Sequence, residues 1–176
     1  MKLIIDNQIR SKYCEGFVRG MLVTEIVIHA TAGRGTLPWM IDGGKKKDGT
    51  DHVNDYKKGI GLFHYLISSD GTVTNVIDPE RWVFHSHAGD HDRQSLGIEL
   101  SKAEENNSDA PTEAQYSALL ELLDQIVKTY PIINTVTSHD HNRRVYSGLD
   151  PKPCPGVFDW ARLVDFAADH RIVIKT

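Results

Sequence analysis

The sequence predicts an α/β domain, because segments typical of buried strands and of amphipathic helices both occur along a chain of single-domain length. β-Branched residues dominate residues 25–31, and glycines in residues 32–35 end this run, which is typical of a buried strand. Thr112 opens a helical pattern of apolar residues. We expect all 176 residues to form one domain, with residues 1–22 as an N-terminal arm of undefined structure.

Two further strands are predicted to form a hairpin after a long loop. Residues 33–59 are rich in Gly, Lys and Asp and lack periodicity, so we expect a surface loop with a short helix near residues 52–58. Residues 61–67 are typical of a strand. The turn signal Ser69-Asp70-Gly71-Thr72 then returns the chain antiparallel as residues 72–77.

Alternating apolar residues predict another strand at Ser95–Leu100. Leu96, Ile98 and Leu100 share one face of this strand. Glu99 points to the opposite face, so its carboxylate is either solvated or directed toward a site.

Helices are predicted in two places in the second half of the chain. Thr112 and Gln115 form a capping box, and the apolar residues that follow keep helical spacing to about residue 130. Residues 158–168 repeat this spacing, so we expect a last helix that packs on the sheet.

The composition excludes several classes of protein. A net charge of −4 argues against a general nucleic-acid binder, which is usually basic. Two cysteines are too few for a secreted disulfide scaffold. The first apolar run is too short for a signal peptide, and no run approaches the roughly 20 residues of a membrane span. We therefore expect a cytoplasmic protein that does not insert into membranes.

Three side chains are candidate ligands of one catalytic zinc ion. Cys154 lies between two prolines, which restrict the backbone, and Lys152 precedes it by two residues. His29 falls at the end of the first predicted strand, and a short predicted strand at Thr135–Ser138 leads directly into His139. Catalytic zinc sites use three protein ligands and keep one position for water, and this set meets that requirement.

Each of these residues also has an ordinary interpretation. Taken alone, His29 is typical of a core histidine, Cys154 of a small buried hydrophobic residue, and Glu99 of a solvent-facing strand residue. His141 competes with His139, because on an extended chain the two side chains point to the same face. We favour His139, which ends the strand directly.

Several blocks, in order, resemble the type 2 family of N-acetylmuramoyl-L-alanine amidases, which includes amidase-type phage lysozymes and animal peptidoglycan recognition proteins. The blocks are Ile26-Val27-Ile28-His29, Phe63-His64-Tyr65, Asp70-Gly71-Thr72-Val73, His87-Ala88-Gly89, Ser95-Leu96-Gly97-Ile98-Glu99-Leu100, Thr112-Glu113-Ala114-Gln115, Ser138-His139-Asp140 and Lys152-Pro153-Cys154-Pro155-Gly156. The resemblance implies a mixed central sheet flanked by helices. It also implies one Zn²⁺ and cleavage of the amide between the lactyl group of N-acetylmuramic acid and L-alanine.

The resemblance assigns ligands and a substrate groove. His29, His139 and Cys154 match the three zinc ligands of the family. His87 matches a histidine of the family's substrate groove, and we take His64 as a second candidate for substrate binding. By position alone, His64 is a structural or rim residue, as are His85 and His91.

The resemblance also implies two catalytic residues. Lys152 matches the lysine that stabilises the oxyanion. Many members carry a catalytic tyrosine where this chain has Phe63, and other members use a glutamate at the position of Glu99. We therefore expect Glu99 to be the general base.

The function expected from these features is hydrolysis of peptidoglycan by a monomeric zinc amidase, with a phage endolysin as the leading interpretation. A cytosolic amidase that recycles muropeptides and a non-catalytic peptidoglycan receptor are the alternatives. A structural zinc site is a further possibility, and chelation would then unfold the protein.

Overall fold

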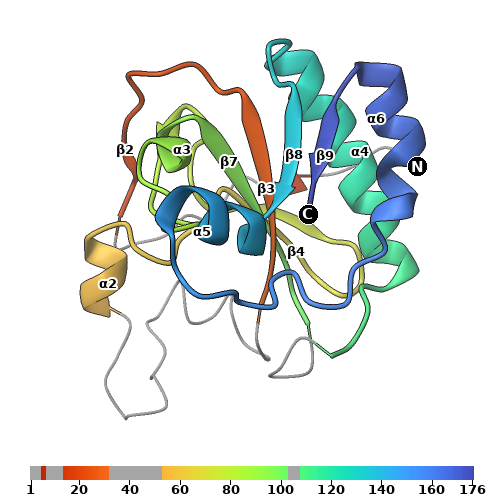
Figure 1. The fold of residues 1–176 in the computed structure, drawn as a ribbon, viewed down its shortest axis with the longest axis horizontal. Coiled ribbons are helices and arrows are strands. Elements are labelled where there is room, and N and C mark those ends of the chain that lie inside the picture. The colour runs from red at the N-terminus through yellow and green to blue at the C-terminus, as the bar shows by residue number, and fades with distance from the viewer. Residues whose placement is uncertain (1–4, 7–13, 32–52, 103–107) are drawn as a thin grey trace.

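A mixed β-sheet forms the centre of the molecule (Figure 1). The computed structural model describes residues 5–6, 14–31, 53–102 and 108–176. Within these ranges the sheet has seven strands in the order β1-β5-β4-β7-β3-β8-β9. They are β1 (Ile5–Asp6), β3 (Glu25–Ala30), β4 (Tyr65–Ile67), β5 (Val73–Asn75), β7 (Ser95–Leu100), β8 (Thr135–Ser138) and β9 (Val173–Lys175).

The pairing confirms the predicted α/β fold with a mixed sheet. β3 lies between β7 and β8, and all three run parallel. β4 is parallel to β7 and antiparallel to β5, as the hairpin signal predicted. Parallel neighbours end at the same edge of a sheet, so β3, β7 and β8 present their carboxyl ends together.

The predicted strand at residues 61–67 is shorter than expected, because β4 begins only at Tyr65. Gly61 has a φ of 72°, a left-handed conformation that does not continue a strand. Its N–H donates to Phe84 O at 2.9 Å, away from the main sheet. The chain at Gly61 therefore pairs with Phe84 instead of with the main sheet.

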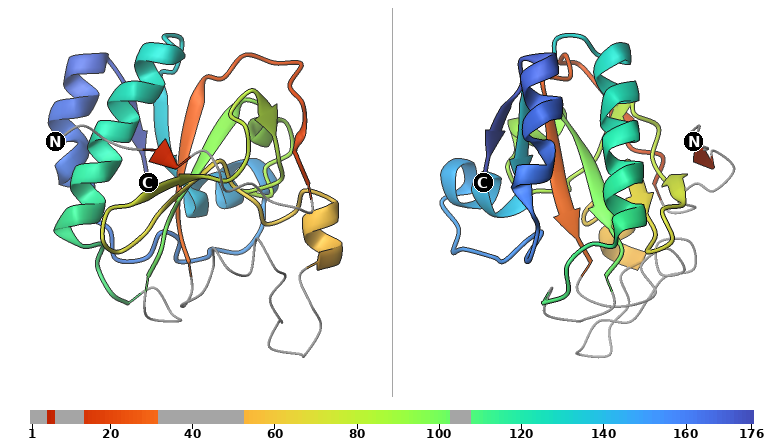
Figure 2. Two further views of the ribbon diagram at one scale, coloured as in Figure 1. Left: turned by 180° about the vertical axis from the view of Figure 1, so that it is seen from behind. Right: turned by 90° about the vertical axis from the view of Figure 1, so that its right-hand side faces the viewer.

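Apolar residues fill the space between one face of the sheet and two helices, α4 (Glu113–Thr129) and α6 (Val164–His170). Leu96, Ile98 and Leu100 point into this core, as their alternation predicted. The capping box of α4 is present, with Thr112 Oγ1 accepting from the Gln115 N–H at 3.1 Å. Figure 2 shows α4 and α6 side by side on this face.

The opposite face carries α5 (His139–Ser147), which the sequence analysis did not predict (Figure 2). Ser138 is its N-cap and accepts from the His141 N–H at 3.0 Å, and Gly148 ends it with a φ of 61°. Both residues are ordinary helix boundary signals. The segment lacks an apolar face, which is why periodicity did not reveal the helix.

The remaining elements are short. The last predicted helix is split into a 3₁₀ turn, η1 (Trp160–Leu163), and α6, and β9 follows it. The helices α2 (Val53–Lys57) and α3 (Asp90–Arg93) border the second face, and α2 agrees with the helix predicted near residues 52–58. A two-stranded sheet pairs β2 (Phe17–Val18) with β6 (Arg81–Trp82). No helix in the described ranges is long and apolar enough to cross a membrane.

Candidate metal centre

His29, His139 and Cys154 lie together at the carboxyl ends of the parallel strands. One possible ligand atom from each residue lies within 4.8 Å of the others. All three side chains are buried. The residues predicted as ligands from distant parts of the chain are therefore neighbours in the fold.

Strand register explains how the two histidines meet. Ile28 pairs with Ser138 in the parallel ladder between β3 and β8, so the next residues, His29 and His139, leave the two strands at the same level. The Cys154 segment contacts both β3 and the first turn of the helix that follows β8. The Asp140 N–H donates to Cys154 O at 3.0 Å, and the Ala30 N–H points to Cys154 Sγ at 3.5 Å.

The geometry of the histidines fits a metal ion. The Nδ1 atoms of His29 and His139 lie 3.1 Å apart. Two nitrogens bound to one tetrahedral zinc lie about 3.3 Å apart, given the usual Zn–N length. The buried His139 Nε2 has no hydrogen-bond partner in the part of the chain that the structure describes. Buried polar atoms are rarely left without a partner, so the His139 ring keeps a nitrogen available to a further partner.

Burial keeps the two imidazoles in the form that binds metal. Burial and the neighbouring His139 lower the pKa of His29 well below its usual value. Burial and the charge of Lys152 lower the pKa of His139 to about 3. Both rings are therefore neutral near pH 7, and a neutral imidazole is the ligand form.

The thiol behaves differently in the metal-free centre. Burial and then the charge of Glu99 raise the pKa of Cys154 to about 12, while Lys152 acts in the opposite direction. A thiol must lose its proton to bind zinc, so metal binding at this centre is expected to release a proton. The set of two imidazoles and one thiolate is chemically suited to zinc.

A family model described as N-acetylmuramoyl-L-alanine amidase matches residues 19–157. The chain belongs to this family. The match contains the candidate metal ligands His29, His139 and Cys154 together with Glu99 and Lys152. A search of curated proteins finds no match.

Solved structures with the same fold include amidases and a recognition protein. The amidase LysCS from Clostridium intestinale URNW is 21% identical, with 97% of each chain covered and a TM-score of 0.65. The Ph2119 endolysin of a Thermus scotoductus bacteriophage is 23% identical, with 97% of this chain and 100% of that chain covered and a TM-score of 0.57. Drosophila peptidoglycan recognition protein SD is 20% identical, covers 88% of this chain and 89% of its own, and has a TM-score of 0.56. At these identities the likeness shows the fold.

Glu99 and Lys152 both lie near the candidate metal ligands. Glu99 is the direct neighbour of His29 across the β3–β7 ladder, and its side chain is buried. Burial raises the pKa of Glu99 to about 8, and the positive charge of Lys152 opposes that rise. Lys152 is exposed, and its backbone N–H donates to Asp140 Oδ1 at 2.8 Å, which holds the loop before Cys154.

His141 does not compete with His139 for the metal cluster. The chain is helical from His139 onward, so residues two apart point in different directions. The expectation that both share a face assumed an extended chain and is wrong. His141 lies near Tyr146, with ring centroids 6.1 Å apart, whereas His139 faces His29.

The two histidines predicted to bind substrate differ in position. The His87 ring stacks near the His139 ring, with centroids 6.0 Å apart and an interplanar angle of 25°. His87 is exposed and lines an open hollow between residues 87–91 and residues 145–149. This location beside the cluster is compatible with contact to substrate.

His64 is fully buried and held by the backbone. Its Nδ1 accepts from the Gly97 N–H at 2.9 Å, so its proton resides on Nε2, which lies 3.0 Å from Arg81 O. These contacts indicate a structural role for His64, which was the alternative to substrate binding. Substrate binding by His64 has no support from its contacts.

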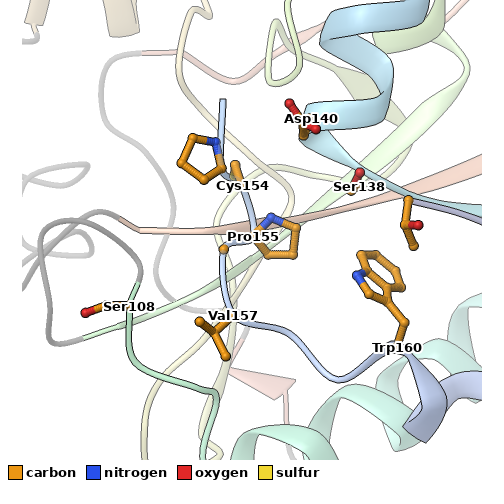
Figure 3. Close-up of a pocket in the computed structure, with 10 residues that line it drawn as sticks. Ser108, Ser138, Asp140, Cys154, Pro155, Val157 and Trp160 are labelled. Carbon is orange, nitrogen blue, oxygen red and sulfur yellow. The ribbon is translucent and has the colours of Figure 1, made fainter. Parts of the chain in front are cut away.

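A second hollow, of about 360 Å³, opens beside Cys154 (Figure 3). Pro155, Val157 and Trp160 line it together with the side chains of Ser138 and Asp140. Its lining includes neither His29 nor Glu99 nor His87. The hollow therefore borders Cys154 without reaching His29, Glu99 or His87.

Sequence reasoning missed one residue that contacts the cluster. His85, which was expected to be structural or at the rim, lies with its Nδ1 3.1 Å from His29 Nε2. Burial and the charge of Arg19 lower the pKa of His85 to about 3, so the ring is neutral. No local motif distinguished His85 from the other histidines. The only sequence signal was its nearness to the His87-Ala88-Gly89 block.

Proposed function

We propose that this chain is a zinc-dependent N-acetylmuramoyl-L-alanine amidase that hydrolyses the amide between the lactyl group and L-alanine of peptidoglycan. The observation that carries the proposal is the buried cluster of His29, His139 and Cys154 in a chain of the amidase family. The donor set and the spacing of its nitrogens support zinc as the metal.

The three ligands would hold the metal on the face of the sheet that also carries Glu99. When bound, zinc supplies a Lewis acid that activates water and polarises the scissile carbonyl. A nearby dication also favours the ionised form of a carboxyl group, which offsets the effect of burial on Glu99. Glu99 is then in the form that accepts a proton.

Glu99 and Lys152 have complementary roles in this proposal. Glu99 takes a proton from the attacking water and delivers it to the leaving nitrogen as the C–N bond breaks. The products are a lactyl carboxylate and the free amine of L-alanine. The Lys152 ammonium stabilises the negative charge that develops on the carbonyl oxygen, a contribution of about 3 kcal/mol for a well-placed donor.

An endolysin role is the more specific form of the proposal. Two similar structures, LysCS and the Ph2119 protein, are described as endolysins and align over nearly the full length of both chains. Digestion of intact sacculi would support this role. Activity limited to soluble muropeptides would favour a recycling amidase.

A non-catalytic receptor is the alternative from a different class. The likeness to peptidoglycan recognition protein SD raises this alternative. The complete ligand set beside a buried Glu99 favours an enzyme. A receptor would bind muropeptide without releasing product.

Mass spectrometry of digested peptidoglycan, together with metal analysis of the purified protein, tests the proposal. We expect about one zinc per chain and products that carry a new amino terminus on L-alanine. Protein that binds zinc but yields no such product, or that cuts a glycosidic bond, would contradict the proposed reaction.

A further inference from the structure

We propose that His85 is a positioning residue that fixes the tautomer of His29, so that His29 offers its Nδ1 lone pair to the metal. Asp92 and Ser95 fix His85 in turn. The proposal concerns the metal centre of the proposed function and rests on it only for the identity of the metal.

The contacts form a continuous path from a carboxylate to the metal cluster. His29 Nε2 lies 3.1 Å from His85 Nδ1, and the two rings are nearly perpendicular at 80°. His85 Nε2 lies 3.0 Å from Ser95 Oγ and 3.6 Å from Asp92 Oδ1. The side chains of His85 and Asp92 are 1% and 0% exposed, so water does not compete for these contacts.

The hydrogen bonds of Asp92 indicate which nitrogen of His85 carries the proton. Asp92 Oδ1 accepts from the Ser86 N–H at 2.8 Å and from the Ser86 hydroxyl at 2.7 Å, and Oδ2 accepts from the Ala88 N–H at 3.2 Å. Burial raises the pKa of Asp92, while these three hydrogen bonds oppose that rise and favour the carboxylate form. An unprotonated His85 Nε2 would direct its lone pair at this anion, so the proton of the neutral ring belongs on Nε2.

The tautomer of His85 then determines that of His29. With its proton on Nε2, His85 presents an unprotonated Nδ1, which accepts a hydrogen bond from the Nε2–H of His29. The Nδ1 of His29 is left unprotonated, and it faces His139 Nδ1 across 3.1 Å. Partners of this kind orient ligating histidines and raise their basicity.

The backbone of β7 is shaped to admit the His85 ring. A Cβ built at Gly97 would lie 3.0 Å from His85 Cγ and 3.1 Å from His85 Nδ1. A side chain at this position would crowd the ring that contacts His29. Ser95, Gly97 and Glu99 alternate along β7, so the hydroxyl partner, the gap and the predicted base share one face.

Two matched substitutions test whether hydrogen bonding or only packing matters. His85→Leu removes the acceptor, whereas His85→Asn is of similar size and keeps an acceptor oxygen near the position of Nδ1. Zinc affinity is measured by competition with a chromophoric chelator. Circular dichroism of the metal-free proteins checks that each variant is folded.

We expect His85→Leu to weaken zinc binding by about 10- to 100-fold, the usual effect of losing such a partner. We expect His85→Asn to retain most of the wild-type affinity. Equal affinities for His85→Leu and wild type, or equal losses in both variants, would overturn the proposal.

Nuclear magnetic resonance of the metal-free wild type tests the tautomers without any variant. Long-range ¹H–¹⁵N correlation of the imidazoles should show the proton of His29 on Nε2 and the proton of His85 on Nε2. A proton on Nδ1 of either ring would overturn the relay while leaving the proposed amidase activity untouched. Correct tautomers in a protein that binds no zinc would instead refute the proposed function alone.

Discussion

Cys154 is the residue whose state depends most on the metal. Its thiol is buried, and burial raises its pKa to about 12 when no cation is present. Without a cation, the protonated thiol and the two neutral imidazoles carry no charge near pH 7. The same side chain becomes an anion on binding zinc, and its charge then offsets part of the charge of the ion.

Replacing Cys154 with alanine should abolish tight zinc binding and activity together. Loss of a partner outside the ligand set already costs about 10- to 100-fold in affinity, so loss of a ligand is expected to cost more than about 100-fold. Metal analysis and a peptidoglycan digestion assay measure the two effects. Cys14→Ala is the matched control, because Cys14 lies outside the cluster and is expected to keep both properties.

A substitution that keeps the shape of Glu99 can separate its predicted catalytic role from metal binding. Glu99→Gln should retain zinc and lower kcat by about 10²- to 10⁴-fold, the usual contribution of a general base. Glu113→Gln, on the exposed surface of α4, is the control and should behave as wild type. Near-normal turnover in Glu99→Gln would remove Glu99 from the mechanism.

At the scale of single elements, the start of α5 decides which histidine reaches the metal. Ser138 caps the helix, so the chain stops being extended at His139. A helix turns by about 100° per residue, which directs His141 away from the direction of His139. A strand of the same sequence would have left the choice open.

This difference predicts opposite results for two neighbouring substitutions. His139→Ala should lose zinc, because its ring faces His29, whereas His141→Ala should keep wild-type zinc content and activity. Metal analysis of the two purified variants checks the prediction. Loss of zinc from the His141 variant would show that α5 does not begin where the structure places it.

Helix α4 offers a stability prediction that is independent of the metal. Thr112 Oγ1 accepts from the Gln115 N–H and donates to Ser69 O at 2.7 Å, so it joins the helix to the hairpin turn. Thr112→Ala should lower the free energy of unfolding by about 1 kcal/mol, as for other helix caps. Thr112→Ser keeps the hydroxyl and should recover most of the loss in a urea titration.

At the scale of the whole molecule, the main core and the metal cluster lie on opposite faces of the sheet. The apolar residues of β3 and β7 pack under α4, while His29 and Glu99 point the other way. Most of the buried apolar area is therefore formed without the metal. This arrangement differs from small zinc domains, which are unfolded without their ion.

Removing zinc with a chelator should leave a folded protein with a lower Tm. Zinc at 1,000 times its Kd adds about 4 kcal/mol of stability by mass action, and chelation removes that term. Circular dichroism before and after dialysis against chelator, followed by thermal scans, measures the change. Complete unfolding at room temperature would mean that the zinc is structural, and the predicted separation of core and cluster would be wrong.

Local patterns in the sequence are sufficient for the elements that bury a continuous apolar face. β3, β7 and α4 agree closely with their predicted positions, because period-2 or helical spacing and the Thr112 capping box are properties of neighbouring residues. The family resemblance added the expected ligands. Apolar periodicity did not reveal α5 and β9, because α5 lacks an apolar face and β9 is a short edge strand.

Only the tertiary structure determines which distant groups meet. The parallel register of β3 with β7 and β8 brings His29 beside both Glu99 and His139. The absence of a side chain at Gly97 on β7 leaves room for the His85 ring, which contacts His29 on β3. Short-range patterns were enough to predict β3, β7, β8, α4 and the kind of donor atoms, because these depend on neighbouring residues. Strand pairing and close packing decided the partner of each donor, because both depend on contacts between residues far apart in the chain.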